Sequence, residues 1–492
     1  MADKQWIPPK KFDTNLVVIG AGAGGLVTSY IAAVVRAKVT LIEKHNMGGD
    51  CLNTGCVPSK ALIRTAKFLS HVSRAAEFGI KTAQVEFDFA DVMERVQAVI
   101  KAVEPHDSIA RYQRHGVDVM IGAAKIVSPW QVEVTTETGV QTISTRSIVI
   151  AAGARPFVPL IKGLDEVGYL TSDTVWNLRN KPKRLLVLGG GAIGCELAQA
   201  FARLGIAVTQ VEMLPRIMMR EDSEVSDIVM GQFRKEGITV LVEHKAKEFM
   251  LENGDKILIA EQNGEEVRIV FDEVLLAIGR VANVSGYGVE EMGIALSPRK
   301  TIAVNGFQET NYPNIYACGD VTGSYQFTHV AAHQAWYAAV NALFGCFKKF
   351  KTDYSVIPWA TFTDPEVARV GLNEQEAKEQ GIAYEISLYG IDELDRAITD
   401  NEARGFVKVL TVPNKDKILG VTIVGEHSGD LIAEFVLAMK HNLGLNKILG
   451  TIHIYPTMAE ANKYVAGVWK RNHAPKKLLV WVERYHTWRR NA

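Results

Sequence analysis

The chain has 492 residues, which is too long for one ordinary hydrophobic core and suggests three domains. Apolar residues make up 47% and charged residues 22%, a balance that excludes a disordered or fibrous chain. Basic and acidic residues number 55 each, so net charge gives no general attraction to nucleic acid or an anionic membrane. Five cysteines are too few for a disulfide-stapled secreted scaffold, and residues 1–15 lack the apolar core of a signal peptide. We therefore expect a cytoplasmic protein.

The first apolar stretch, residues 15–35, carries no charge and is long enough to span a membrane. Residues 16–19 are rich in β-formers, however, and Gly20, Gly22, Gly24 and Gly25 follow at once and would break a helix. A buried parallel strand that leads through a glycine turn into a helix explains the same letters. We therefore expect no membrane span here.

This strand, turn and helix carry the pattern Gly20-x-Gly22-x-x-Gly25, and the next strand, VTLIE, ends in Glu43. The first two glycines allow a tight turn and a close approach to a pyrophosphate, while the third lets the helix pack on the strand. The helix N-terminus stabilises the negative charge. Glu43 is expected to accept a hydrogen bond from an adenosine ribose.

The same unit occurs a second time. Residues 185–188 are predicted to form a strand, Gly189-x-Gly191-x-x-Gly194 the turn, and residues 195–204 a helix. The strand VTQVE then ends in Glu212, with the same spacing from its first glycine as Glu43. The alternative is that these glycines serve only helix–sheet packing, but two matches with identical spacing arise by chance far less often than one. The sequence therefore predicts two bound dinucleotides with electron transfer between them.

The remaining segments indicate an interrupted first domain. Helical spacing of apolar residues predicts two helices within 61–113, and alternating strands follow over 117–145. Residues 147–156 close a strand with a glycine turn, residues 274–280 resemble a parallel strand, and residues 301–320 return to the first domain. From about residue 354, mixed strands and a helix over 430–444 indicate a separate α+β domain.

Two cysteines stand in the run GGDCLNTGCVPSK, residues 48–60, just after the first dinucleotide pattern. The alternatives for Cys51 and Cys56 are two buried free thiols or half of a metal site, although metal sites usually have a second ligand pair nearby and none follows. A helix N-terminus and Lys60 would lower the pKa of a thiolate here. We interpret the two as a redox-active pair. The other cysteines are isolated and expected to be structural: Cys195, Cys318 and Cys346.

With these motifs, the chain resembles the flavin-dependent pyridine nucleotide–disulfide oxidoreductases, the family of glutathione reductase, dihydrolipoamide dehydrogenase and mercuric reductase. The family pattern GGxCxNxGCxPSK matches residues 48–60, the second flavin motif T-x-x-x-x-I-Y-A-x-G-D matches residues 310–320, and the opening of the interface domain matches residues 360–371. The resemblance implies an α/β fold with two Rossmann-like dinucleotide-binding domains and an α+β C-terminal dimerisation domain.

The resemblance also implies domain boundaries and cofactor sites. The implied segments are 1–157 and 285–352 for the FAD-binding domain, 158–284 for the NAD(P)-binding domain, 353–470 for the dimerisation domain and 471–492 for a basic aromatic tail. The residues expected to bind FAD are Gly20, Gly22, Gly25, Glu43, Gly49, Lys60, Ala124, Gly153, Asp320 and His329. Those expected to bind the nicotinamide coenzyme are Gly189, Gly191, Gly194, Glu212 and Gly279, and Glu196 is a further expected cofactor-binding residue. No metal site is expected.

By the same resemblance, Lys60 pairs with Glu196 beside the flavin, and helix 329–344 points its N-terminus at the flavin ring. Cys56 faces the flavin and Cys51 faces the substrate. Electrons pass from the nicotinamide to the flavin, then to the disulfide, and then to a substrate. The active sites are shared across a homodimer.

Glu212 favours NADH, because its carboxylate suits a ribose hydroxyl and repels a 2′-phosphate. Arg216 and Arg220 follow closely and could still accommodate such a phosphate, so NADPH stays an alternative.

The chain departs from the family near its C-terminus. Disulfide-reducing members carry His-Pro-Thr-x-x-Glu, in which the partner subunit supplies the histidine as acid and base. Here Tyr455 stands at the histidine position and Glu460 is retained. A phenol, with a reference pKa of about 10, is a poor base at neutral pH. His453, two residues earlier, is a weak candidate to replace it.

Mercuric reductases resemble this chain in having tyrosine at that position, and a thiolate-bound metal ion needs no such proton shuttle. The vicinal C-terminal cysteines of that group are absent, however. We expect a mercuric-reductase-like enzyme that reduces a disulfide, a persulfide or a thiol-bound metal, with Cys51, Cys56, Lys60, Tyr455 and Glu460 in catalysis. The alternatives are a dihydrolipoamide dehydrogenase and, in another class, a redox-sensing flavoprotein without small-molecule turnover.

The last residues, 473–492, predict an amphipathic helix. One face carries Leu478, Trp481, Val482, Tyr485 and Trp488, with basic residues around it. The favoured interpretation is a helix packed on its own dimer, and the alternative is a helix that lies on a membrane surface.

Overall fold

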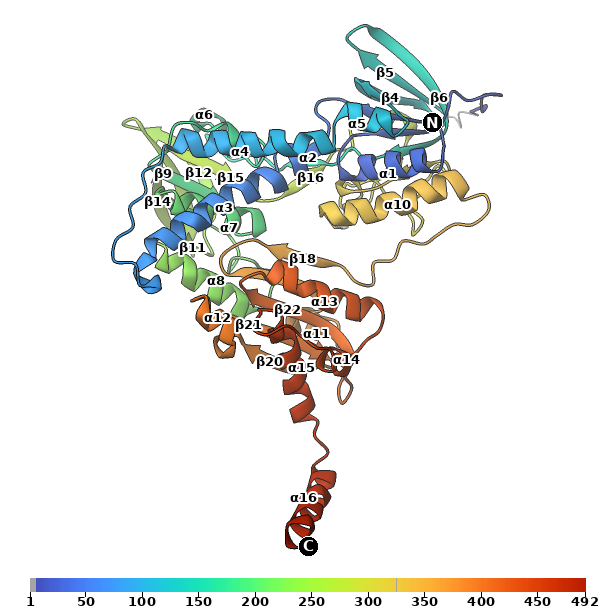
Figure 1. Ribbon diagram of the computed structural model, residues 1–492. Coiled ribbons are helices and arrows are strands. Elements are labelled where there is room, and N and C mark those ends of the chain that lie inside the picture. The colour runs from blue at the N-terminus through green and yellow to red at the C-terminus, as the bar shows by residue number, and fades with distance from the viewer. Residues whose placement is uncertain (1–5, 324) are drawn as a thin grey trace. The chain divides into compact units, whose positions relative to one another are not determined.

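The computed structural model describes residues 6–323 and 325–492 (Figure 1). The chain forms two compact units. The first unit consists of residues up to 70, 85–213 and 241–353, and the second of residues 71–84, 214–240 and 354–492. Among the described residues, no helix combines the length and the apolar character needed to cross a membrane.

The first unit contains a seven-stranded sheet with the order β3-β2-β1-β6-β5-β4, in which β17 also pairs with β6. Strands β2, β1, β6 and β17 are parallel. The pairing of β17 with β6 returns residues 315–317 to this sheet, as the sequence predicts. The strands are β1 (Thr14–Ile19), β2 (Val39–Glu43), β3 (Val117–Ile121), β4 (Ala123–Ser128), β5 (Gln131–Thr136), β6 (Gly139–Ile150) and β17 (Ile315–Ala317).

Strand β1 is buried on both faces, which explains why its sequence is apolar without alternation. Leu16 and Val18 pack into a hydrophobic cluster with α1 (Ala23–Val34) and α10 (Thr328–Phe344). Val17 and Ile19 pack on the opposite face, against strands β4 and β5. The uncharged stretch at residues 15–35 is therefore a central strand, a turn and a helix, as expected.

A second parallel sheet in the first unit has the order β11-β10-β9-β15-β8. Strand β15 runs parallel to β9 and ends at Leu276, while residues 280–282 form β16, which pairs antiparallel with β7. Gly279, with φ +130°, separates the two, so the strand predicted over 274–280 is interrupted. The strands are β7 (Ala154–Pro156), β8 (Leu170–Thr171), β9 (Arg184–Leu188), β10 (Ala207–Val211), β11 (Thr239–Leu241), β15 (Glu273–Leu276) and β16 (Arg280–Ala282).

An antiparallel three-stranded sheet packs against this second sheet in one hydrophobic cluster. Its strands are β12 (Lys245–Glu252), β13 (Asp255–Gln262) and β14 (Glu265–Phe271). The helices that lie wholly or mostly in the first unit are α1, α2 (Gly49–Asn53), α3 (Cys56–Ser73), α4 (Phe89–Val103), α5 (Ile109–Arg114), α6 (Leu164–Val167), α7 (Ala192–Arg203), α9 (Val289–Met292) and α10. The long helices α3 and α4 match the two predicted within 61–113.

The second unit has a five-stranded antiparallel sheet with the order β18-β19-β22-β21-β20, and α13, α14 and α15 pack into its core. Helix α13 ends at Lys440 and does not continue to residue 444, because Asn442 adopts a left-handed φ of 55°. The strands are β18 (Pro358–Thr361), β19 (Glu366–Gly371), β20 (Glu385–Gly390), β21 (Phe406–Thr411) and β22 (Ile418–Gly425). The helices are α8 (Ser223–Lys235), α11 (Glu374–Glu379), α12 (Asp395–Thr399), α13 (Ser428–Lys440), α14 (Leu445–Leu449), α15 (Glu460–Asn472) and α16 (Lys476–Asn491).

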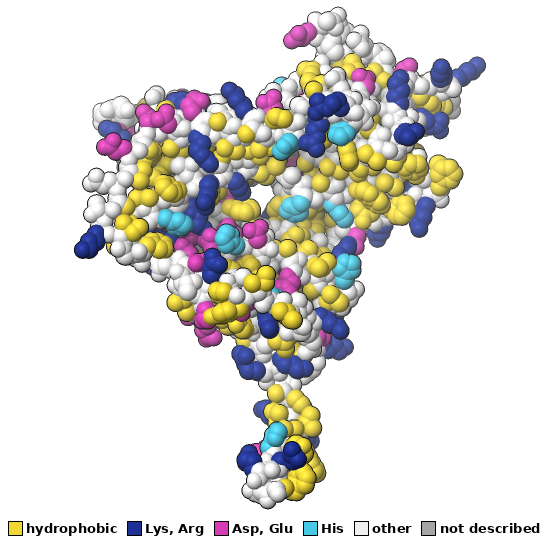
Figure 2. All heavy atoms as spheres, viewed as in Figure 1, with side chains coloured by type: hydrophobic (Ala, Val, Ile, Leu, Met, Phe, Trp, Pro, Cys, Tyr) yellow, Lys and Arg dark blue, Asp and Glu magenta, His cyan; other side chains and the backbone are white. Residues whose placement is uncertain are grey.

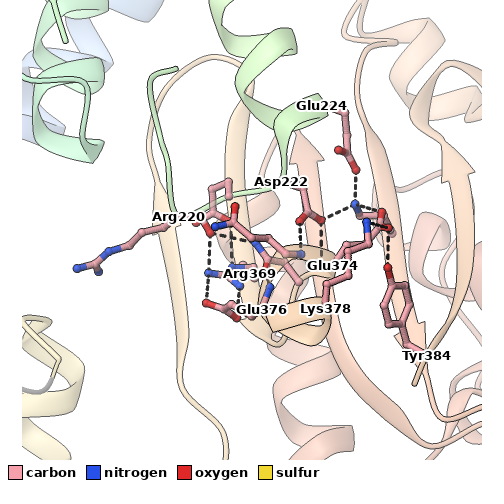
Figure 3. Close-up of polar contacts among 12 residues, drawn as sticks. Arg220, Asp222, Glu224, Arg369, Glu374, Glu376, Lys378 and Tyr384 are labelled. Atoms are coloured by element: carbon pink, nitrogen blue, oxygen red, sulfur yellow. Dashed lines mark hydrogen bonds and ion pairs between the residues drawn. The ribbon is translucent and has the colours of Figure 1, made fainter. Parts of the chain in front are cut away.

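Charged residues are buried inside the second unit (Figure 3). The side chain of Lys408 on β21 is only 2% exposed, and its Nζ lies 2.5 Å from Asp222 and 3.0 Å from Glu374. It also pairs with Glu224. The Arg369 guanidinium on β19 lies 3.0 Å from Glu221 and 2.6 Å from Glu376. It also lies 4.2 Å from the centre of the Trp359 ring. These contacts fix residues 221–224 to the C-terminal sheet.

Candidate functional site

The two cysteines of the predicted redox pair lie beside each other in the first unit. Cys51 is in α2, and Cys56 is the first residue of α3, so its thiol is at a helix N-terminus as predicted. Both are free thiols, and Cys51 hydrogen-bonds Cys56. This hydrogen bond lowers the pKa of Cys56 to about 6, although neighbouring atoms partly desolvate the exposed thiol and oppose the shift, while the same bond and burial raise the pKa of Cys51 far above its ordinary value. At neutral pH the reduced pair therefore holds one proton, on Cys51, and one negative charge, on Cys56.

Thr328 adds a polar contact to this pair that the sequence did not predict. It is the first residue of α10, and its Oγ1 lies 3.6 Å from the Sγ of Cys56. After the bond from Cys51, this hydroxyl also lowers the pKa of Cys56, and Lys60 adds a smaller effect in the same direction. The predicted helix started one residue later, at 329, so no sequence signal pointed to the hydroxyl.

Lys60 and Glu196 form an ion pair, with Nζ 2.7 Å from Oε2. Lys60 lies in the first turns of α3, and Glu196 lies on α7, the helix of the second glycine pattern. The Glu196 side chain is 8% exposed, so Lys60 supplies the charge that a buried carboxylate needs. The pair expected from the resemblance is thus present, and its position beside a flavin stays a prediction.

A second charged group near the cysteines was also missed in the sequence. The Arg280 guanidinium pairs with Asp50 and lies 3.8 Å from Asp320. Burial raises the pKa of Asp320 to about 6, although Arg280 opposes this effect. Burial likewise raises the pKa of Asp50. Because Asp50 directly precedes Cys51, this cluster connects the predicted ribitol-binding acid to the redox pair.

The first glycine turn has the geometry that its pattern predicts. Gly20 has φ +100°, and a Cβ there would lie 2.4 Å from the carbonyl oxygen of Ala151. A Cβ at Gly25 would lie 1.7 Å from the carbonyl oxygen of Gly20, which explains the close helix–strand packing. Glu43 at the end of β2 accepts a hydrogen bond from the Ala21 N–H at 2.7 Å. The acid is therefore held against the turn.

The second turn repeats this geometry. Gly189 has φ +116°, and a Cβ at Gly194 would lie 2.2 Å from the carbonyl oxygen of Gly189. Glu212 accepts a hydrogen bond from the Gly190 N–H at 2.6 Å. The Arg216 guanidinium, in the second unit, donates to the carbonyls of Met219 and Glu221 and to the side chain of Gln375.

Both turns lead into helices whose N-termini fit a bound phosphate. Helices α4 and α5 are capped by the side chains of Asp88 and Ser108. By contrast, α1 and α7 start after Gly22 and Gly191, with no side-chain cap and no acidic residue in the first turn. Their first N–H groups are thus left for an external acceptor, and the helix dipole favours an anion there. The residues present fit a dinucleotide pyrophosphate at each turn.

The remaining residues expected at the cofactors lie in less distinctive positions. A Cβ at Gly153 or Gly279 would meet no atom within 4 Å, so both places have room next to the backbone. Gly49 comes close to Gly22, where its Cβ would lie 2.6 Å from the Cα. The ring of His329 in α10 stacks on Phe327 with centroids 5.3 Å apart. Ala124 in β4 is buried in the hydrophobic core.

The predicted acid–base residues lie in the second unit. The Tyr455 hydroxyl donates a hydrogen bond to Asp395 at 3.0 Å, and this bond raises the pKa of the phenol. Glu460 is buried and accepts hydrogen bonds from the Tyr464 hydroxyl at 3.0 Å and from the Thr457 N–H at 3.3 Å. Tyr455 is therefore oriented by Asp395 and not by a hydrogen bond to Glu460.

His453 is held by two partners at once. Its Nδ1 lies 3.1 Å from the Thr451 carbonyl oxygen, and its Nε2 lies 3.0 and 3.1 Å from the two carboxylate oxygens of Glu434. Since both ring nitrogens are engaged, His453 is poorly placed to replace the missing base. Of the other cysteines, Cys195 and Cys318 are buried, whereas Cys346 is exposed.

Two family models match the chain. Residues 14–335 match "Pyridine nucleotide-disulphide oxidoreductase", and residues 357–466 match "Pyridine nucleotide-disulphide oxidoreductase, dimerisation domain". Together they span both nucleotide patterns, the cysteine pair and the antiparallel sheet of the second unit.

Curated relatives of two kinds are similar to the chain. A dihydrolipoyl dehydrogenase from Chlamydia muridarum is 34% identical over 458 residues, covering 91% of this chain and 94% of the relative. A mercuric reductase from Lysinibacillus sphaericus is 36% identical over 463 residues, covering 93% and 83%. Among solved structures, the Cu(II) complex of the HOCl-induced flavoprotein disulfide reductase RclA from Escherichia coli has a TM-score of 0.81 and 26% identity, covering 92% of this chain and 99% of that one.

Proposed function

The chain belongs to the pyridine nucleotide–disulphide oxidoreductase family, and on this premise we propose that it transfers electrons from NADH to the Cys51–Cys56 pair and on to a thiol-bound metal ion. As a member of this family it is an oxidoreductase that uses FAD and NAD(P)H. Its dimerisation domain supports a homodimer. The coenzyme preference, the site residues and the acceptor are the parts that we propose.

The residues that would hold FAD are those of the first glycine turn. The free N–H groups of α1 would bind its pyrophosphate, Glu43 its adenosine ribose and Asp320 its ribitol. Bound there, FAD would supply the two-electron chemistry that links the nicotinamide to the disulfide. The Lys60–Glu196 pair would lie beside the ring, where Lys60 would supply a positive charge while it also compensates Glu196.

The cysteines store the electrons in an asymmetric form. Reducing the disulfide takes up two electrons and one proton and gives a Cys51 thiol and a Cys56 thiolate, since Cys51 has the raised and Cys56 the lowered pKa. The helix N-terminus at Cys56 stabilises the anion, and the Thr328 hydroxyl lies close enough to donate to it. Cys51 would be the sulfur that attacks the acceptor.

The observation that carries the choice of acceptor is the environment of Tyr455. Its hydroxyl is bonded to Asp395, which raises the pKa of the phenol, and His453 is engaged at both nitrogens. The phenol is therefore a poor base at neutral pH, and His453 has no ring nitrogen left to reach a substrate. Reduction of a disulfide ends in two thiols and needs protons, whereas reduction of a thiolate-bound metal ion releases thiolates and needs none. The site therefore supports a metal acceptor better than a disulfide acceptor.

Two contacts support NADH as the electron donor. Glu212 is held at the second glycine turn, where its carboxylate would repel a 2′-phosphate. Arg216, which could have offset that repulsion, already donates to two carbonyls and to Gln375. We expect a lower KM for NADH than for NADPH. An equal or lower KM for NADPH would contradict this assignment.

The test is an anaerobic assay of NADH oxidation with a set of acceptors. We expect rapid turnover with mercuric ion in excess thiol, and slow turnover with lipoamide, glutathione disulfide or polysulfide. Cys51→Ser and Cys56→Ser should each abolish turnover with the metal. Rapid reduction of NAD⁺ by dihydrolipoamide would overturn the proposal in favour of a dihydrolipoamide dehydrogenase. Cysteines that NADH reduces, without turnover of any acceptor, would indicate a redox sensor.

A further inference from the structure

Helix α16 (Lys476–Asn491) is exposed along its whole length. Every residue from Pro475 to Ala492 is exposed, although seven of them are large apolar or aromatic side chains. They are Leu478, Leu479, Val480, Trp481, Val482, Tyr485 and Trp488. Large apolar side chains that stay in water along one helix usually mark a binding surface.

Five of these side chains form one face, which we call the tail face: Leu478, Trp481, Val482, Tyr485 and Trp488. At about 100° per residue they occupy about 120° of the helix circumference. Figure 2 shows hydrophobic side chains along one side of this helix. Leu479 and Val480 lie outside the tail face. Within the tail face, the ring of Trp488 lies 6.1 Å from that of Tyr485.

The charges of α16 are almost all positive. Its only acid is Glu483. Its five cations are Lys476, Lys477, Arg484, Arg489 and Arg490. Lys477 and Arg484 flank the tail face on one side, and the Arg484 guanidinium lies 5.8 Å from the centre of the Trp481 ring. At the same 100° per residue, Arg489 falls within the tail face, but it lies in the last turn of the helix, where a long side chain can extend its charge to water or headgroups.

We propose that α16 lies on the surface of an anionic lipid bilayer, with the tail face in the interface between headgroups and acyl chains. Three of the five tail-face side chains are Trp or Tyr, whose rings combine an apolar body with a polar group and concentrate at this depth. The flanking cations match anionic headgroups, and the helix is not long and apolar enough to span the bilayer.

A second copy of the chain fits the tail face less well. Leu478, Trp481, Tyr485 and Trp488 have the spacing of a coiled-coil seam, but the seam covers only two heptads, fewer than such pairing normally needs. Two such helices side by side would also bring their cations together without enough acids to balance them. Charge complementarity therefore favours the anionic bilayer.

The test compares two matched double variants of the full-length FAD-loaded protein. Leu478→Ser/Val482→Ser changes the tail face, and Leu479→Ser/Val480→Ser makes the same changes elsewhere on the helix. Binding is measured by co-sedimentation with vesicles of phosphatidylcholine alone and of phosphatidylcholine mixed with phosphatidylglycerol. We expect binding to the anionic vesicles only, a loss of about tenfold or more in the tail-face variant, and little change in its control.

A charge variant tests the second half of the proposal. Arg489→Gln/Arg490→Gln should weaken binding about fivefold per arginine, and added salt should weaken binding of the unmodified protein. NADH-dependent activity should be unchanged in all variants, because none lies in the catalytic site. No binding to anionic vesicles, or equal losses in the two serine variants, would overturn the proposal. A smaller particle in ultracentrifugation for the tail-face variant, without vesicle binding by the parent, would instead identify a second copy as the partner.

Discussion

Replacing Cys51 by alanine tests how the redox pair stabilises its negative charge. The hydrogen bond from Cys51 is the largest effect on Cys56 and lowers the pKa of that thiol to about 6 from an ordinary value of 9.0. Alanine removes the donor, whereas serine keeps a hydroxyl donor at the same place. We therefore expect the pKa of Cys56 to rise in Cys51→Ala and to rise less in Cys51→Ser.

The size of the change follows from the strength of one hydrogen bond. A hydrogen bond to a charged group contributes about 1.5–3 kcal/mol, and about 1.36 kcal/mol corresponds to one pH unit of pKa. Cys56 is exposed, so solvent screens the contact and we take the lower limit, about one pH unit. The thiolate fraction at pH 7 then falls from about 0.9 to about 0.5. Thr328 and Lys60 remain in place, so the pKa stays below its ordinary value.

The assay is alkylation of the reduced protein by iodoacetamide from about pH 5 to about pH 9, followed at Cys56 by mass spectrometry, because the thiolate is the reacting form. Each profile is normalised to its plateau, since the intrinsic nucleophilicity of a thiolate rises with its pKa. The exposed Cys346 serves as an internal reference. If the midpoint for Cys56 is the same in Cys51→Ala, Cys51→Ser and the unmodified protein, the hydrogen bond does not stabilise the thiolate and our account of the pair is wrong.

Further predictions concern the buried charges and the acid–base position. Lys408→Met should destabilise the second unit by about 3–5 kcal/mol in urea unfolding, since it leaves the buried Asp222 without its cation, whereas Lys378→Met, at an exposed ion pair, should cost much less. Burial raises the pKa of Asp222, but Lys408 outweighs this effect, so the pKa is lowered. The stability that the pair contributes is therefore lost as pH falls through that lowered pKa, and the loss caused by Lys408→Met should shrink in acid. An equal loss at all pH values would contradict this. Burial raises the pKa of Asp320 to about 6, so without FAD its ionisation costs stability as pH rises from about 4 to about 6. Asp320→Asn should therefore raise the melting temperature of the FAD-free protein at pH 7 but not at pH 4, and it should weaken FAD binding. A lower melting temperature of the variant at pH 7 would contradict this prediction. Tyr455→His should accelerate glutathione disulfide or lipoamide reduction and add a pH dependence near the pKa of histidine, about 6.5, to kcat; an unchanged rate would show that this position takes no part in proton transfer.

Features that depend on neighbouring residues could be predicted from the sequence. The spacing of the glycines requires a positive φ at Gly20 and Gly189, and the structure has both. The pairing of Cys51 and Cys56 is similarly local, because α2 and α3 are adjacent in the chain. The parallel strands around each turn followed from their unbroken apolar runs. In each case a steric or packing requirement acts within a short stretch and leaves a pattern in it.

Contacts between distant segments left no such pattern. The hydroxyl of Thr328 reaches Cys56 across 272 residues, and Arg280 reaches Asp50 across 230. Lys408 is a single charge within the strand FVKVLT, where alternation would place it in water. It is buried because Asp222, 186 residues earlier, provides the opposite charge. A buried charge is stable only with its partner, and one sequence does not show which acid will lie nearby.

The two glycine turns differ in a way that suits two different cofactors. In the first, the chain after Glu43 returns over the turn: the Gly48 N–H donates to the Ala21 carbonyl oxygen at 2.9 Å, and Gly49 approaches Gly22. In the second, a Cβ at Gly191 would meet no atom within 4 Å. The segment that carries the redox cysteines therefore packs against the first turn, whereas the second turn has open space at the equivalent glycine. We propose that this difference keeps FAD resident at the first turn and lets a nicotinamide coenzyme exchange at the second.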